Sequence, residues 1–351
     1  MTRNDNRVFR SSFAQPTMSR PRFLPDNFTL SLITTVVIAS LLPCRGGVAN
    51  VFNGLTTIAI ALLFFLHGAK LSSEAIVSGV THWRLHLLVF CSTFIMFPLI
   101  GLALQPIFAP LITPALYAGV LFLCVLPSTV QSSIAFTSIA RGNVSAAVCS
   151  ASASSFIGIF LTPLIASVIV ETQGSVHTSV LKSMGSIVLQ LLVPFLAGHL
   201  ARRWIGSWIE RNKGVLRFVD QGSILLVVYV AFSEAVVEGL WHHTSPLSLL
   251  LLVVTCGVLL AIALVVTSVA AKQFGFNRAD QITIIFCGSK KSLASGIPMA
   301  KVIFASNAVG AVVLPLMLFH QIQLMTCAVL AQRWGARADA GNAELASSPR
   351  A

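Results

Sequence analysis

The chain has 351 residues, of which 56% are hydrophobic and only 10% are charged, and its mean hydropathy is +0.86. Soluble domains carry about a quarter charged residues, and disordered chains combine high charge with low hydrophobicity, so this composition excludes both classes. The formal net charge of +12 comes from basic residues in short breaks between apolar runs, as membrane topology requires. We therefore expect an all-α membrane protein surrounded by lipid, with no nucleic-acid partner.

Long apolar segments divide the chain into membrane spans. A hydrocarbon core of about 30 Å requires about 20 apolar residues per helix. In chain order, this length predicts ten transmembrane helices, over residues 24–43, 51–70, 84–105, 114–140, 143–170, 180–201, 216–239, 246–271, 279–303 and 306–332.

The fourth and ninth predicted spans are interrupted near their middle. The fourth contains Pro127, Ser128 and Thr129, and the ninth contains the run GSKKS over 288–292. Proline removes a backbone donor and glycine weakens a helix. Each of these two spans is therefore predicted to be a broken helix.

Lysine and arginine residues gather in every second loop, and this asymmetry sets the orientation of the spans. The basic segments are the N-terminal arm, the loops after spans two, four, six and eight, and the C-terminal tail. Both termini are expected in the cytoplasm, with the arm over 1–22 and the tail over 335–351 disordered. No small-residue cleavage site follows the first span, and the short loops favour the inner membrane of a bacterium.

A self-match indicates an internal repeat. The segment Ser73–Gly79 (SEAIVSG) recurs 160 residues later as Ser233–Gly239 (SEAVVEG). At the same offset, Pro127 in the first break corresponds to Cys287, which lies beside the second break. The chain is therefore predicted to contain two five-helix repeats, over 23–170 and 180–334. Because each repeat has an odd number of spans, the second copy is inverted.

Inverted five-helix repeats with one broken helix in each copy are typical of secondary transporters. A break at the bilayer midplane frees backbone groups that lipid cannot satisfy, so these groups line a cavity or meet each other. Half-helix N-termini then attract anions, and freed carbonyls attract cations. The alternative is that Pro127 and Gly288 are ordinary kinks, because both residue types are common in membrane helices.

Two adjacent lysines, Lys290 and Lys291, lie in the middle of the ninth span. A lysine at the centre of a membrane helix costs about 2.5–3.5 kcal/mol on insertion scales. The presence of two lysines there therefore needs a structural or functional explanation. One interpretation is an anion contact, or a fixed ammonium where a mobile cation would sit. The other is a topogenic pair that reaches the interface from a shorter span.

Hydroxyl and amide side chains surround both breaks. They are predicted to bind substrate or ion together with the two lysines, although small hydroxyl residues also serve as contacts between membrane helices. Glu74 and Glu234 end their spans and are expected at the interface. The predicted site residues are Ser128, Thr129, Gln131, Ser132, Ser133, Ser289, Lys290, Lys291 and Ser292.

The segment LPSTVQSSIA over 126–135, followed by ARGNV over 140–144, resembles the bile acid:sodium symporter family. The similarity is to the branch of the seventh member of vertebrate solute carrier family ten and its bacterial relatives. The segment FCGSKKSL over 286–293, with GIPM after it, is similar to that branch's ninth-span motif. The resemblance covers about 23–334. It implies a panel domain of spans one, two, six and seven, and a core domain in which broken spans four and nine cross.

The sodium ligands of that family are only partly present. Its sodium-coupled members use a Ser-Asn pair in span four, hydroxyls in span five, and an acid and a glutamine in span nine. The corresponding residues here are Ser132 and Ser133, Ala147 and Ala151, and Phe286 and Lys290. Hard cations need oxygen ligands, so the two-sodium mechanism is predicted not to be intact. An ammonium at Lys290 or Lys291 is expected to replace one sodium and to couple transport to protons.

The sequence thus predicts a secondary active transporter that moves a small organic, anionic solute by alternating access. The alternative is a non-transporting membrane regulator of ion homeostasis, such as calcium entry, which resemblance to the vertebrate branch implies. The motifs HExxH, GxxxxGK[ST] and GxSxG are absent, and the seven cysteines show no CxxC spacing. No enzyme activity, metal site or cofactor is expected beyond Na⁺ or H⁺ as coupling ion, and the sequence predicts no oligomeric state.

Overall fold

The computed structural model describes residues 27–70, 82–171, 180–237, 239–243, 245–304 and 306–347. Every regular element within these ranges is a helix. The N-terminal arm over 1–22 and the first copy of the self-match, Ser73–Gly79 with Glu74, lie outside the described residues.

The helices follow the predicted spans in order along the chain. The first half contains α1 (Asn27–Leu41), α2 (Gly46–Lys70), α4 (Trp83–Cys91), the π-helix η2 (Ser92–Met96), α5 (Phe97–Phe108), the 3-10 turn η3 (Ala109–Leu111), α6 (Pro114–Val125), α7 (Gln131–Ile139) and α8 (Val144–Glu171). The second half contains α9 (Val180–Arg211), α10 (Lys213–Val237), α11 (Leu240–His243), α12 (Pro246–Gln273), α13 (Arg278–Gly288), α14 (Leu293–Ile303) and α15 (Ser306–Ser347).

Six helical stretches of the described chain are long and apolar enough to cross a membrane. They are Gly46–Lys70, Trp83–Leu111, Val144–Ile169, Lys213–Val237, Pro246–Gln273 and Ala308–Ala338. Two shorter apolar helices accompany them, Leu30–Leu41 and Pro114–Val125. The prediction of an all-α, multi-pass membrane protein is confirmed.

The last helix extends into the segment that the sequence predicts to be a disordered tail. The segment over 335–347 continues α15, which ends at Ser347. This stretch (ARADAGNAELAS over 336–347) is rich in alanine, the residue with the highest helix propensity. Adding residues to an existing helix requires no new nucleation, so a polar, alanine-rich tail extends the last span as helix.

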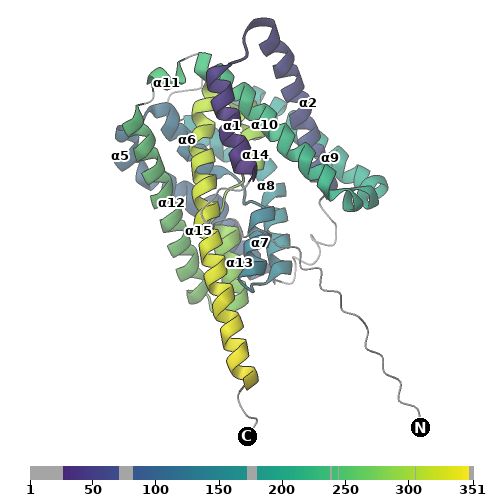
Figure 1. Cartoon of the computed structure of the whole chain (residues 1–351), viewed down its shortest axis with the longest axis vertical. Coiled ribbons are helices and arrows are strands. Elements are labelled where there is room, and N and C mark those ends of the chain that lie inside the picture. Colours follow the sequence, from purple (N-terminus) through teal and green to yellow (C-terminus); the bar gives the residue numbers. More distant parts are fainter. Residues whose placement is uncertain are drawn as a thin grey trace, which may run out of the picture.

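The helices pack in two groups (Figure 1). The panel group consists of α1, α2, α9 and α10, of which α2 and α9 make the most extensive contact. The core group consists of α4 to α8 and α12 to α15, with α15 packed along α6, α12 and α14. Helix α10 also packs against α14 and α15 and so connects the two groups. In Figure 1, α6 and α14 lie above α7 and α13.

Two glycines allow α2 and α9 to approach each other closely. A Cβ atom on Gly68 would lie 1.9 Å from the carbonyl oxygen of Phe195, and a Cβ on Gly198 would lie 1.9 Å from that of Phe65. Small residues at such contacts let helix backbones meet in membranes, where van der Waals packing contributes much of the association. The panel group therefore depends on these two positions.

We predict that Gly198→Ala lowers the thermal unfolding midpoint of the detergent-purified protein, because the added methyl collides with a backbone carbonyl. Overpacking of this kind costs about 1–3 kcal/mol. Gly222→Ala, on α10, is the matched control, since a Cβ there meets nothing within 4 Å. Equal midpoints for the two variants would contradict the role assigned to Gly198.

Candidate functional site

The breaks between α6 and α7 and between α13 and α14 are in direct contact. The backbone N–H of Ser292 donates to the carbonyl oxygen of Pro127 at 2.9 Å. The hydroxyl of Ser128 donates to the carbonyl oxygen of Cys287 at 2.6 Å. The two interruptions, far apart in sequence, therefore satisfy each other's backbone groups, as interrupted helices inside a bilayer require.

Hydroxyl side chains satisfy further backbone groups that the breaks release. The Ser133 hydroxyl donates to the Phe286 carbonyl at 3.0 Å, at the end of α13. From α8, Thr162 donates to the Val125 carbonyl at 2.8 Å. Ser154, also on α8, accepts the backbone N–H of Ser128 at 3.0 Å. Each of these bonds replaces one that a continuous helix would make within itself.

Lys291 is fully buried at the crossing point. Its Nζ donates to the carbonyl oxygens of Thr93 at 2.7 Å, Cys124 at 2.7 Å and Leu126 at 2.8 Å. The same atom lies 4.2 Å from the centre of the Phe97 ring, within cation–π range. A single side chain thus joins the third, fourth and ninth predicted spans.

The three carbonyls are free because of the local backbone geometry. In the π-helix η2, the N–H of Phe97 bonds to the Ser92 carbonyl instead of the Thr93 carbonyl. The next candidate donor is Pro98, which has no N–H, so the Thr93 oxygen has no helical partner. The carbonyls of Cys124 and Leu126 are free because α6 ends at Val125. Such π-bulges occur frequently at functional sites.

Gln323 of α15 completes the second break, and sequence reasoning did not single it out. Its Oε1 accepts the backbone N–H of Lys291 at 2.9 Å, and its Nε2 donates to the Lys291 carbonyl at 2.9 Å. The side chain is fully buried. The amide therefore supplies the hydrogen bonds that the Lys291 N–H and C=O would make in a regular helix or strand.

Lys290 has different surroundings from Lys291. Its Nζ lies 3.3 Å from the Ser132 hydroxyl, and 4.2 Å and 5.7 Å from the ring centres of Phe136 and Phe286. The Ser132 hydroxyl is 3.2 Å from that of Thr129. An ammonium and two hydroxyls therefore form a short polar chain at the start of α7.

The predicted site residues divide into two sets. Gln131 is exposed, and Ser132, whose hydroxyl lies close to both Lys290 and Thr129, is half-buried. The remaining hydroxyls have structural roles: Ser289 donates to Ile285 at 2.6 Å, and Ser292 caps the start of α14. The accessible part of the predicted site is therefore the first turn of α7 with Lys290 beneath it.

The positions that the resemblance aligns with the sodium ligands of span five are apolar here. Ala147 and Ala151 are fully buried, and Ala147 belongs to an apolar cluster with Ile284 and Cys287. Phe286, at the position of the acid, packs its ring 6.0 Å from that of Phe136. None of these three residues carries a side-chain oxygen.

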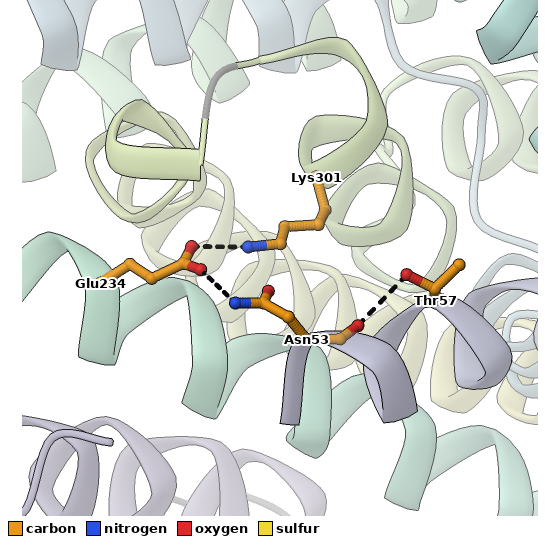
Figure 2. Close-up of polar contacts among 4 residues, drawn as sticks. All are labelled: Asn53, Thr57, Glu234 and Lys301. Atoms are coloured by element: carbon orange, nitrogen blue, oxygen red, sulfur yellow. Dashed lines mark hydrogen bonds and ion pairs between the residues drawn. The ribbon is translucent and has the colours of Figure 1, made fainter. Parts of the chain in front are cut away.

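A second polar cluster joins the panel group to the core group (Figure 2). The carboxylate of Glu234 on α10 accepts from the Lys301 ammonium on α14 at 2.5 Å. It also accepts from the Asn53 amide on α2 at 2.8 Å. The Glu234 and Lys301 side chains are only 17% and 10% exposed. Glu234 thus takes part in an ion pair between two helices, and its expected position at the membrane interface stays a prediction.

Several long apolar helices, together with two interrupted helices that cross, define a multi-pass membrane protein of the kind that transports solutes. The family model of the SBF-like CPA transporter family matches residues 26–336. The chain therefore belongs to this family, and it is a membrane transporter of the bile acid:sodium symporter type.

Curated relatives agree with this assignment. The chain is 57% identical to a putative symporter, YfeH, of Escherichia coli, over 92% of this chain and 97% of the relative. It is 66% identical to an uncharacterized protein of Pseudomonas aeruginosa, over 95% and 99% of the two chains. It is 29% identical to the sodium/bile acid cotransporter 7 of the mouse, over 86% and 90%. Neither the family nor these names point to the non-transporting regulator.

Replacement of Gln323 by leucine is predicted to destabilise the protein strongly. Gln323→Leu leaves the N–H and C=O of Lys291 unpaired in a buried site, which costs about 2–6 kcal/mol for two groups. The measurement is the thermal unfolding midpoint in detergent.

Gln321→Leu is the control on the same helix, because the Gln321 Oε1 is buried without a hydrogen-bond partner among the described residues. That control is expected to match or exceed the wild-type midpoint. A Gln323→Leu protein as stable as Gln321→Leu would show that the amide does not support the break.

Proposed function

We propose that this protein is a secondary active transporter that moves a small organic anion across the cytoplasmic membrane by alternating access. In this proposal the chain has ten spans in two inverted five-helix repeats, with both termini in the cytoplasm. The observation that carries the proposal is the contact between the two helix breaks, with Lys290 beside the accessible first turn of α7. Interrupted helices of this kind hold the solute sites of secondary transporters.

The charge and hydrogen-bond donors at the break favour an anionic solute. Helix α7 begins at Gln131, and the N-terminus of a helix carries a partial positive charge and unpaired N–H groups. The Lys290 ammonium and the Ser132 hydroxyl lie at the same turn, 3.3 Å apart. A carboxylate or a similar anion would receive donors from all three.

Two features support alternating access. Helix α14 packs against α9 and α10 of the panel group, where the Glu234–Lys301 ion pair joins them, whereas α7 packs against the core helices α8, α13 and α15. Under the proposed topology, α14 and Lys301 lie in the outer half of the membrane and α7 in the inner half. The described arrangement is then closed on the outside, and opening to the outside requires the ion pair to separate.

The coupling ion differs from the two sodium ions of the family mechanism. Ala147, Ala151 and Phe286 supply no side-chain oxygen for a hard cation, and such ions need oxygen ligands. Lysine ammonium groups occupy the crossing instead. We propose that transport continues without sodium and that a lysine charge takes the place of one ion.

Uptake into proteoliposomes tests the function. A thermal-shift screen of the wild-type protein against organic anions first identifies a solute, because binding to the folded state raises the unfolding midpoint. Uptake of the labelled solute is then expected to persist when external Na⁺ is replaced by K⁺. Lys290→Ala is expected to reduce uptake at least tenfold, since one charged contact contributes about 1.5–3 kcal/mol.

Lys272→Ala is the control for these assays, because Lys272 is exposed at the end of α12. Wild-type uptake with full sodium dependence in both Lys290→Ala and Lys291→Ala would refute the coupling proposal. A screen in which no organic anion stabilises the protein would refute the proposed substrate class.

Hydrogen–deuterium exchange tests the outer closure. Glu234→Gln keeps the size of the side chain but removes the charge that Lys301 pairs with. Exchange is expected to become faster in α14 and slower in α7, because opening one side of an alternating-access transporter closes the other. The charge-swapped double variant Glu234→Lys with Lys301→Glu is expected to restore the wild-type pattern.

The matched control is Asp220→Asn, which removes an ion pair with Lys70 inside the panel group. Asp220→Asn is expected to leave the exchange rates of α14 and α7 unchanged. Faster exchange in α14 with no change in α7 would mean that Glu234 only stabilises its neighbourhood.

A further inference from the structure

The oxygen atoms around the Nζ of Lys291 are arranged like the ligands of a bound cation. A protonated lysine has three N–H donors and no acceptor, and the Nζ of Lys291 has three carbonyl oxygens at 2.7, 2.7 and 2.8 Å. A neutral amine has only two N–H groups, so it would leave one of these buried carbonyls unpaired. The three acceptors therefore match the ammonium form of Lys291.

We propose that the carbonyls of Thr93, Cys124 and Leu126, with the ring of Phe97, form a monovalent-cation site that Lys291 fills with its own side chain. Rings of backbone carbonyls replace the hydration shell of monovalent ions in channels, and an aromatic face adds cation–π attraction. The ligand class of this cage is a monovalent cation or a primary alkylammonium. Its role as a fixed coupling ion rests on the proposed function, but the cage itself does not.

The cage is built by the backbone and does not depend on Lys291 for its shape. The Thr93 oxygen is free because of the π-turn and Pro98, and the Cys124 and Leu126 oxygens are free because α6 ends at Val125. The C-terminal end of α6 also carries a partial negative charge. Removal of the lysine would therefore leave three aligned, buried carbonyls without a donor, a state that favours uptake of a cation from solution.

Lys290 provides a contrast within the same break. Its ammonium lies near one hydroxyl and two aromatic rings, and the hydroxyl belongs to the half-buried Ser132. Both lysine side chains are fully buried, but they have different partners. Lys290 lies beside the half-buried Ser132 at the start of α7, whereas Lys291 is held by three carbonyls as an internal cation.

Chemical rescue tests the cage. Lys291→Ala removes three carbon atoms and the ammonium, which together correspond to n-propylammonium. Added n-propylammonium is expected to raise the unfolding midpoint of Lys291→Ala saturably, by a few degrees, and to leave the wild type unchanged because its cage is full. Neutral 1-propanol is expected to have no such effect. Lys290→Ala, which lacks a carbonyl cage, is the matched control and is expected to show no rescue.

Equal shifts in Lys291→Ala, Lys290→Ala and the wild type would overturn the proposal. Lys291→Met keeps the volume of the side chain without its charge, and a midpoint equal to that of the wild type would also overturn it. Rescue of Lys291→Ala without any solute uptake by the wild type would leave the cage standing and refute the transport function. Solute uptake by the wild type without rescue of Lys291→Ala would refute the cage and leave the transport function standing.

A second measurement uses the wild-type protein and so does not depend on a variant that folds. With ¹⁵N-labelled lysine, the Lys291 ammonium is expected to give an NH₃⁺ signal whose protons exchange with water at least tenfold more slowly than those of exposed lysines. Lys291→Arg, which keeps the charge, serves to assign the signal. A neutral amine at Lys291, or an ammonium that exchanges at the ordinary rate, contradicts the cage.

Discussion

Unpaired backbone groups at the centre of a membrane protein must find partners inside the protein, because lipid supplies none. In this transporter hydroxyl side chains, the Gln323 amide and the amine of Lys291 supply these partners. Lys291 donates to carbonyls that a π-turn in the third span and a break in the fourth span set free. The same residue, whose backbone is held by Gln323, fixes the break between α13 and α14. The crossing of the two broken helices depends on this set of bonds.

With the breaks satisfied in this way, few side chains remain for a solute. Ser128, Ser133 and Thr162 donate to backbone carbonyls, and Ser292 caps α14. The polar groups left near the surface are those at the start of α7, with Lys290 beneath them. The ion pair of Glu234 and Lys301 lies on the other half-helix, α14, and connects it to the panel group. One half-helix of the crossing pair is thus tied to the panel group, and the other has its extensive contacts within the core group.

Sequence reasoning worked where a signal was local. Pro127 and Gly288 mark the two breaks, and the structure ends α6 at Val125 and α13 at Gly288. The lysine pair was recognised because charge in an apolar span is costly. Thr93 was missed because a carbonyl becomes a ligand only through its backbone geometry. Gln323 was missed because nothing in the sequence distinguishes it from the neighbouring Gln321. The ion pair of Glu234 was not predicted because its partner, Lys301, lies on a helix distant in sequence.

Composition and hydropathy by themselves determined that this protein is helical and lies in a membrane, since segments of that length and polarity have no other stable environment. Local chemistry determined where its helices are interrupted. The tertiary structure alone decided the partners of the two lysines, which are both fully buried. Lys291 meets three backbone carbonyls, and Lys290 meets a hydroxyl and two aromatic rings. Adjacent residues on a chain differ in direction by about 100° in a helix and differ further where the helix stops, so their partners depend on packing between spans distant in sequence.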